Sequence, residues 1–277
     1  MTDTVKRLLL FLIMMPFLTF LILFLPHYKN IAVIILIAIV GFLCGQEMRT
    51  ILSKTEKKLP SWTVLIPTLA APLAWLVNMG WMPEQIPPLL MILVVLWSFI
   101  DAVFAREEEL KSGITRMGSR LLMIVYPGWM LWWVARLTWF DHAGFVMFIF
   151  MLTVYLSDAT AWLFGILLGR HRNIFAVSPN KSVEGFLGGT LASVVVILIS
   201  ARLRPDILSH PVWQLIIFGI VAAFTTIMGD LVESALKRAV GVKDSGHIFP
   251  GRGGMLDSVD STLLTAPIFV WFLQLAV

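Results

Sequence analysis

The sequence predicts an all-α integral membrane protein that crosses the bilayer about nine times. Apolar residues make up 58% of the 277 residues and charged residues only 14%, and the mean hydropathy is +0.88. Apolar runs of about twenty residues recur along the chain, and this is the length that a helix needs to cross a bilayer. Because lipid cannot hydrogen-bond to the backbone, these runs must be helices.

The runs place nine spans along the chain. They cover 8–26, 31–45, 62–79, 88–104, 120–139, 145–168, 184–202, 212–235 and 261–277. The first run resembles a signal peptide but continues to Pro26 without a small-residue cleavage site, so we expect a retained span. No internal repeat or low-complexity linker interrupts the chain. We therefore expect one integral membrane domain over 1–277, with scaffold helices in 1–140 and catalytic helices and loops in 141–277.

The distribution of cations predicts the orientation. Of the 21 Lys and Arg residues, all but four (Lys29, Arg136, Arg202 and Arg204) fall on one side of these spans. The positive-inside rule then puts the N-terminus in the cytoplasm and the C-terminus outside, as expected for a multi-pass protein of the cell (inner) membrane. The pI near 9.4 reflects this topology and contact with anionic membrane lipid rather than a nucleic-acid partner. The single cysteine, Cys44, excludes an internal disulfide and a cysteine metal cage.

Charged residues enter the apolar runs from residue 157 onward. Asp158 lies well inside the sixth span, and an ionisable group at such depth is a functional candidate; the alternative is a structural carboxylate capped by its neighbours. The loop that follows contains "SPNKSVEGFLGG", in which Ser178 resembles a helix start with Lys181 and Glu184 in the first turns. A helix N-terminus presents free backbone N–H groups to a phosphate. Glycines at 185, 188 and 189 would let another helix or a ligand approach closely.

The end of the eighth span carries a polar stripe. Its members recur at i, i+3, i+4, i+7 and i+8 and therefore share one helical face: Asp230, Glu233, Ser234, Lys237 and Arg238.

The next segment, "VKDSGHIFPGRGGMLDSVDS" (242–261), adds a lysine, an arginine, three aspartates and four glycines. The glycines would allow tight turns and close approach to a ligand. Several carboxylates in an apolar setting need a cation. Hard oxygen donors without a histidine or cysteine cluster favour Mg²⁺ or Mn²⁺. Together these groups suit phosphoryl or nucleotidyl transfer, which depends on positioning and charge neutralisation. No Walker loop is present.

The two motif regions, "SPNKSVEGFLGG" and "GDLVESALKRAVGVKDSGHIFPGRGGMLDSVDS", resemble the signatures of the phosphatidate cytidylyltransferases. The C-terminal family pattern runs approximately S-x-x-K-R-x-x-x-x-K-D-x-G, then P-G-H-G-G-x-x-D-R-x-D. This chain departs from it at Arg252, where the family usually has histidine, and at Ser258, where it usually has arginine. The resemblance covers roughly residues 157–261.

The resemblance implies transfer of a cytidylyl group from CTP to phosphatidate, giving CDP-diacylglycerol and pyrophosphate, in a polar cavity near the cytoplasmic face. It implies Mg²⁺ (or Mn²⁺) held by Asp230 and Asp257. It implies that three residues are catalytic, namely Lys243, Asp244 and Asp260. It implies that six residues bind substrate: Ser178, Lys181, Ser234, Lys237, Arg238 and Arg252. Asp158 and Glu184 are further candidates for the site. Phosphatidate would enter laterally from the cytoplasmic leaflet.

Other functions remain open. The pattern of a CDP-alcohol phosphotransferase, DGxxAR followed by GxxxDxxxD, is missing. A cation-coupled secondary transporter could use Asp158 and Asp230, although transporters tend to place such groups near the midplane on broken helices. Because of Arg252 and Ser258, a weakened paralogue with a different lipid-phosphate substrate is a further alternative. The oligomeric state is also open, with a homo-oligomer as one alternative.

Overall fold

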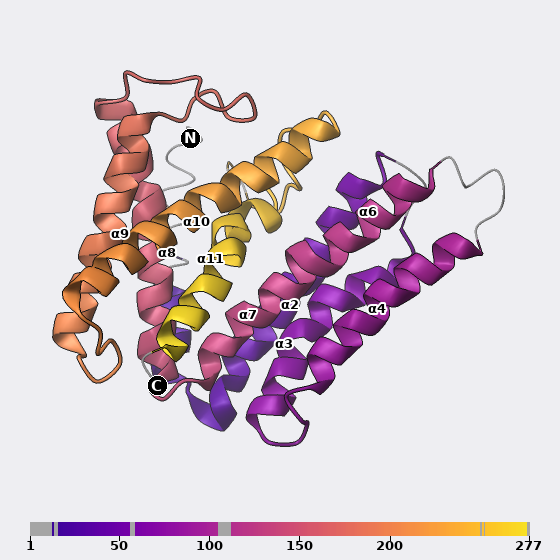
Figure 1. Cartoon of the computed structure of the whole chain (residues 1–277), viewed down its shortest axis with the longest axis horizontal. Helices are drawn as coiled ribbons and strands as arrows, with labels where there is room; N and C mark the ends of the chain where they lie inside the picture. The colour runs from indigo at the N-terminus through magenta and orange to yellow at the C-terminus, as the bar shows by residue number, and fades with distance from the viewer. Residues whose placement is uncertain are drawn as a thin grey trace. The chain divides into compact units, whose positions relative to one another are not determined.

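The protein is built from helices (Figure 1). The computed structural model describes residues 13, 16–55, 59–104, 112–249, 251 and 253–275. Within these residues, eight helices are long and apolar enough to cross a membrane, and β-type pairing is limited to one bridge between Phe249 and Gly253. The chain is an all-α polytopic membrane protein.

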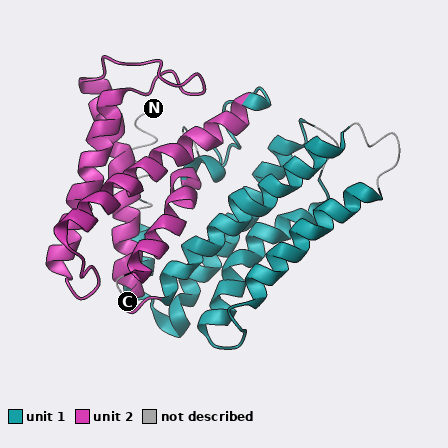
Figure 2. Ribbon diagram, in the orientation of Figure 1, with its two compact units in different colours: residues 1–139, 239–258 teal, residues 140–238, 259–277 magenta. Residues whose placement is uncertain are grey.

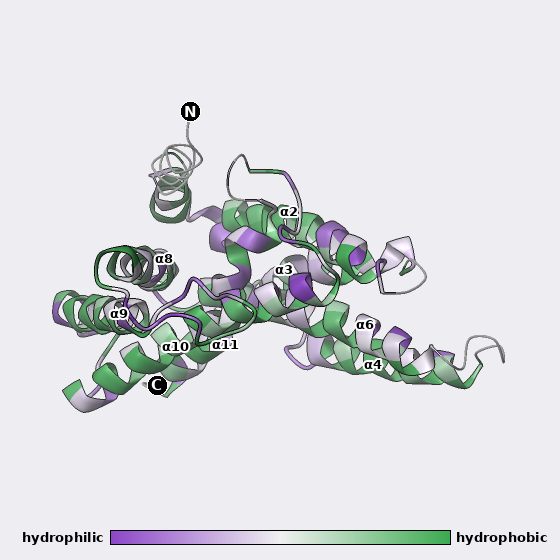
Figure 3. Ribbon diagram, turned by 90° about the horizontal axis from the view of Figure 1, so that it is seen from above, coloured by the Kyte–Doolittle hydropathy of each residue, from purple (hydrophilic) through white to green (hydrophobic). Residues whose placement is uncertain are grey.

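The eight membrane-length helices correspond in order to the second through ninth predicted spans. Residues 8–12 and 14–15 of the first predicted span, 8–26, lie outside the described residues, and its described part is helical at 16–24. Hydrophobic colours run along helices such as α8 and α9 (Figure 3). Large apolar side chains on these helices are exposed, for example Trp162 at 56% and Leu191 at 59%, and in a membrane they face lipid.

The chain divides into two compact units (Figure 2). The first consists of residues 1–139 and 239–258, and the second of residues 140–238 and 259–277. The expectation of a single membrane domain remains a prediction. The segment 239–258, which carries much of the signature, belongs with the N-terminal half.

The described residues of the first unit contain four membrane-length helical stretches. Its elements are α2 (His27–Leu52), η1 (Ser61–Val64), α3 (Leu65–Asn78), α4 (Ile86–Val103), α6 (Gly113–Met123), η2 (Ile124–Trp129), α7 (Met130–Arg136) and η3 (Leu137–Trp139). Helix α2 packs close to α3 at Gly41, which has no side chain. A Cβ atom there would be only 2.8 Å from the carbonyl carbon of Pro67. The η2 turn is a π-helix that contains Pro127, whose missing N–H favours such a local widening.

The second unit contains α8 (Ala143–Leu167), α9 (Val183–Leu203), most of α10 (Val212–Ala239) and most of α11 (Leu256–Gln274). Glycines set its helix spacing. A Cβ atom at Gly185 would be 2.6 Å from the carbonyl oxygen of Ala161 on α8, and one at Gly219 would be 2.6 Å from Cα of Val194 on α9. The prediction that the glycines of α9 admit a neighbouring helix is therefore confirmed.

Aromatic rings fill the centre of this unit. Phe218 of α10 stacks on Phe272 of α11 with ring centroids 3.9 Å apart, and Phe269 contacts both Phe218 and Phe150. Such burial of large rings provides a rigid support for the polar ends of α10 and α11.

Candidate functional site

The glycine-rich segment between α10 and α11 folds back on itself in the first unit. Backbone hydrogen bonds join Phe249 and Gly253 in both directions, with N···O distances of 2.8 and 3.1 Å. Gly251 and Gly253 have φ angles of 81° and 107°, which side-chain-bearing residues rarely adopt. The predicted tight turn is confirmed at these two glycines.

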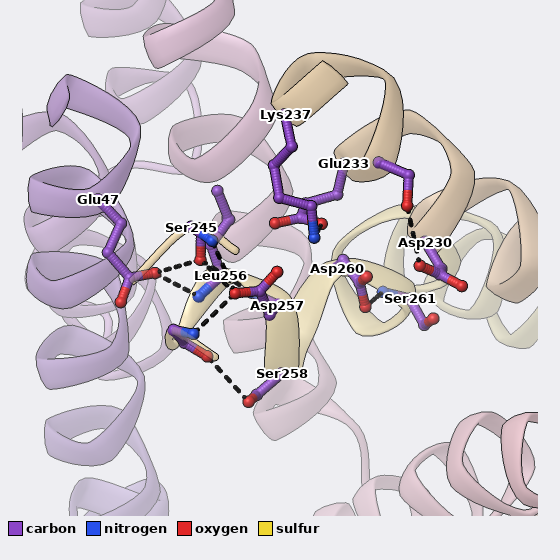
Figure 4. Close-up of polar contacts among 12 residues, drawn as sticks. Glu47, Asp230, Glu233, Lys237, Ser245, Leu256, Asp257, Ser258, Asp260 and Ser261 are labelled. Atoms are coloured by element: carbon purple, nitrogen blue, oxygen red, sulfur yellow. Dashed lines mark hydrogen bonds and ion pairs between the residues drawn. The ribbon is translucent and has the colours of Figure 1, made fainter. Parts of the chain in front are cut away.

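Asp257, a predicted metal ligand, closes this turn at the start of α11 (Figure 4). Its Oδ2 atom accepts hydrogen bonds from the backbone N–H of Ser245 at 2.8 Å and of Gly254 at 2.7 Å, and from the Ser245 hydroxyl at 2.8 Å. The ninth span was expected to begin near residue 261, but α11 begins at Leu256. Helix α11 begins earlier than expected because Asp257 lies in its first turn, where the positive end of the helix dipole favours a carboxylate.

A second carboxylate, Glu47 on α2, contacts the same segment (Figure 4). It accepts hydrogen bonds from the backbone N–H groups of Met255 and Leu256, both at 2.8 Å, and lies 2.9 Å from the Ser245 hydroxyl. Sequence reasoning missed Glu47 because the predicted second span ended at residue 45. The signal was available: α2 continues through Glu47 to Leu52, and an acid inside an apolar helix is a functional candidate.

The predicted stripe on α10 is present in the second unit. Lys181 forms an ion pair with Asp230, with Nζ and Oδ2 2.6 Å apart, and the Ser234 hydroxyl lies 3.5 Å from Asp230 Oδ1. Glu233 is fully buried and pairs with Lys237 one turn later. Arg238, the last predicted member, is exposed.

Asp260 lies beside α10 in the same unit. A Cβ atom at Gly229 would be 2.5 Å from the Asp260 carbonyl oxygen, so the glycine allows α11 to approach. Asp260 is 7% exposed, and Asp230, Asp158 and Lys237 all lie within electrostatic reach of it. In the second unit, Asp260 of α11 therefore feels the charges of Asp158 on α8 and of Asp230 and Lys237 on α10, and Asp230 in turn pairs with Lys181.

The loop before α9 differs in detail from the prediction. The helix begins at Val183, and Ser182, not Ser178, is the N-cap: its side chain accepts the Gly185 N–H at 3.1 Å. A serine with extended backbone suits this role, whereas Ser178 lies in a preceding turn whose carbonyl accepts the Lys181 N–H at 3.2 Å. Glu184, in the first turn, contacts Nδ1 of His171 at 2.6 Å, which ties the loop to the helix.

The remaining predicted residues lie in or beside the glycine-rich segment. Lys243 and Asp244 are exposed. Arg252 lies outside the described residues. Ser258, which replaces the family's arginine, donates its hydroxyl proton to the Gly254 carbonyl at 3.0 Å, so it stabilises the turn at the position where an arginine would add a charge.

The donor chemistry in both units suits a hard divalent cation. The acidic members supply carboxylate oxygens, which Mg²⁺ and Mn²⁺ prefer. Across the described part of the chain, no three His, Cys, Asp or Glu residues are grouped as a ready-made metal cage. Mg²⁺ in nucleotide enzymes commonly uses one or two carboxylates, with waters and substrate phosphates completing its shell, so the carboxylates found within each unit are of the kind that this mode uses.

Comparison with known proteins identifies the family. A family model described as "Cytidylyltransferase family" matches residues 5–276. The phosphatidate cytidylyltransferase of Staphylococcus epidermidis is 37% identical over 172 residues, which are 62% of this chain and 59% of that protein. Proteins with the same name from Staphylococcus haemolyticus and Staphylococcus aureus are each 36% identical over 172 residues, so the aligned part is less than two thirds of the length of these relatives. Because the family model covers nearly the whole sequence, the chain belongs to the cytidylyltransferase family.

Proposed function

We propose that this protein transfers a cytidylyl group from CTP to phosphatidate, forming CDP-diacylglycerol and pyrophosphate. The family match over residues 5–276 carries the proposal, together with relatives named phosphatidate cytidylyltransferase. The family match does not favour the alternative of a cation-coupled secondary transporter.

The chemistry requires no strong general base. A phosphate monoester has a second pKa of about 6, so the attacking oxygen of phosphatidate is largely anionic at neutral pH. This oxygen attacks the α-phosphorus of CTP, the new P–O bond forms, and the bond to the bridging oxygen breaks as pyrophosphate leaves. The main barrier is repulsion between two polyanions, and cations relieve it.

The residues of this chain would divide that task. We propose Asp230 and Asp257 as ligands of Mg²⁺ (or Mn²⁺), because the family signature contains both residues. Asp244 and Asp260 would be further acidic residues of the site. When bound, the metal supplies positive charge to the phosphate oxygens. Lys181, which already reaches Asp230, would contact phosphate.

Other cations and hydroxyls complete the proposed site. Lys243 and Arg252 would contact phosphates with Lys181, while Lys237 and Arg238 would contribute charge at the end of α10. Ser178 and Ser234 would give polar support. Phosphatidate would enter laterally from the cytoplasmic leaflet with its acyl chains in lipid.

The proposed activity has a direct test. Purified protein in detergent is incubated with α-labelled CTP, phosphatidate and Mg²⁺, and the lipid product and pyrophosphate are measured. We expect one pyrophosphate for each CDP-diacylglycerol, and no product when EDTA replaces Mg²⁺. Absence of product with phosphatidate, but turnover with another lipid phosphate, would favour the divergent paralogue.

The proposed orientation has the N-terminus in the cytoplasm and the C-terminus outside, because of the uneven distribution of Lys and Arg. A reporter fused after Val277 should therefore behave as external. A cytoplasmic signal at that fusion contradicts the orientation.

A further inference from the structure

Glu47 is a buried acid, and in the described part of the chain its hydrogen-bond donors come from the signature segment. Its side chain belongs to α2, and the residue is 7% exposed. One carboxylate oxygen, Oε1, accepts the Met255 N–H, and the other, Oε2, accepts the Leu256 N–H. These two N–H groups stand at the N-terminus of α11, where no intrahelical acceptor exists for them. Glu47 therefore caps the N-terminus of α11, although it belongs to a helix about 200 residues earlier in the chain.

Two glycines of the signature fit the carboxylate of Glu47. A Cβ atom at Gly246 would be 2.5 Å from Glu47 Oε1, and one at Gly254 would meet both Glu47 and the Ser245 hydroxyl. Neither position can therefore carry a side chain while the Glu47 carboxylate stays in place. Close approach to a protein carboxylate explains these two glycines, whereas Gly251 and Gly253 serve the turn.

Ser245 links Glu47 to Asp257. Its Oγ atom lies 2.9 Å from Glu47 Oε2 and 2.8 Å from Asp257 Oδ2. A hydroxyl has a single proton and so donates to one carboxylate at a time, while the Ser245 N–H also donates to Asp257. Glu47 thus contacts the segment that precedes Asp257 at two places, the Ser245 hydroxyl and the Met255–Leu256 backbone.

We propose that Glu47 is a positioning residue that holds the 245–256 backbone and, through Ser245, orients the Asp257 carboxylate. The effect on catalysis rests on the proposed function, whereas the effect on the backbone does not. Glu47 needs two acceptor oxygens, one for each N–H. Glutamine supplies only one, so Glu47→Gln must leave one backbone N–H facing an amide NH₂ group.

Asp101 offers a matched control in the same unit. It is also an acid near the end of a membrane-length helix, but its partner is the Arg120 side chain, with Nη1 and Oδ2 2.6 Å apart. The Asp101→Asn variant therefore weakens an ion pair without touching the signature segment.

The experiment combines steady-state kinetics with hydrogen exchange of the full-length protein in detergent. For Glu47→Gln we expect kcat to fall about ten- to a hundredfold, as when a group that orients a functional ligand is lost, with KM for CTP nearly unchanged. Glu47→Asp keeps both acceptor oxygens and should recover part of the loss. Without substrates, amide exchange at Met255 and Leu256 should accelerate in Glu47→Gln and stay unchanged in Asp101→Asn.

The outcomes separate this proposal from the proposed function. Wild-type kcat and wild-type exchange in Glu47→Gln overturn the positioning role, and so does a rise in KM alone. If the native protein shows no cytidylyl transfer, the proposed function fails and the exchange of Met255 and Leu256 alone decides the role of Glu47. Should Glu47→Gln fail to accumulate, Ser245→Ala removes the link to Asp257, and wild-type kcat in that variant contradicts the proposal.

Discussion

The two units hold their acids in different ways. In the first unit, backbone N–H groups and one hydroxyl of the segment 245–256 donate hydrogen bonds to Glu47 and Asp257. In the second, Asp230 is paired with the flexible side chain of Lys181, and Asp260 has two other aspartates within electrostatic reach. Backbone donors fix a carboxylate in place, whereas a lysine ammonium can be exchanged for a metal ion or turned to a phosphate. The comparison indicates that backbone donors hold the acids of the first unit, whereas Asp230 in the second unit is held by a side-chain cation that can be exchanged.

The largest expected effect comes from neutralising the proposed metal ligands. Asp230→Asn and Asp257→Asn should each lower turnover by about a hundredfold or more, as when a positioned electrostatic group is removed. Both variants should fold, because asparagine has nearly the same shape. In Asp257→Asn the amide oxygen can still accept the Ser245 and Gly254 N–H groups, so the loss reports charge rather than loop structure. Steady-state rates near wild type in both variants rule out the metal-binding role.

Replacing Arg252 tests whether the first unit also contributes charge. If this arginine performs the phosphate contact that the family gives to histidine and arginine, Arg252→Ala should lower CTP turnover about ten- to a hundredfold, because a charge-assisted contact contributes about 1.5–3 kcal/mol. The double variant Arg252→His, Ser258→Arg should then change activity only modestly. A weakened paralogue gives the opposite pattern, with no turnover in the native chain and a large gain in the double variant. Equal turnover in native and Arg252→Ala proteins excludes Arg252 from the site.

A third prediction concerns the spacing that brings Asp260 beside Asp230. Gly229→Ala places a methyl group against the Asp260 carbonyl, and overpacking of this kind typically destabilises by about 1–3 kcal/mol. Gly118→Ala, on α6 where a Cβ atom meets open space, is the control and should be neutral or slightly stabilising. Thermal unfolding in detergent measures both. Equal unfolding temperatures would show that thermal stability does not require the close approach of α11 to α10 at Gly229.

The smallest expected effect is at the start of α9. Ser182→Ala removes the cap of the Gly185 N–H and should destabilise the protein by about 1 kcal/mol, with a correspondingly small drop in unfolding temperature. Ser112→Ala is the comparison, because the Ser112 side chain does not cap α6. If the two variants unfold alike, Ser182 is not an energetically important cap.

The sequence predicted the helices well because their signal is local. Runs of apolar residues and the demand for satisfied backbone groups identify membrane helices without knowledge of their partners. The stripe from Asp230 to Arg238 was likewise predictable, since helical periodicity places its members on one face. The pairing of Lys181 with Asp230 was not, because it joins a loop to a helix 49 positions later and depends on packing.

Three features of the site depend on contacts that the sequence does not display. Glu47 acts on a segment about 200 residues away, so only the fold reveals its role. The glycines at 246 and 254 looked like ligand-approach positions, but Gly246 lies against the Glu47 carboxylate and Gly254 against the Ser245 hydroxyl and the same carboxylate. The start of α9 was misplaced at Ser178 because two serines four residues apart both resemble caps, and only the backbone conformation distinguishes them.

Direct measurement of metal binding tests the central claim that the aspartates of the signature hold a divalent ion. Mn²⁺ is titrated into the purified protein with CTP present, and free Mn²⁺ is followed by electron paramagnetic resonance. We expect saturable binding to the native protein, affinity at least about tenfold weaker in Asp230→Asn, and native affinity in the control Asp101→Asn. Equal Mn²⁺ affinity in the native and Asp230→Asn proteins would contradict metal binding by Asp230.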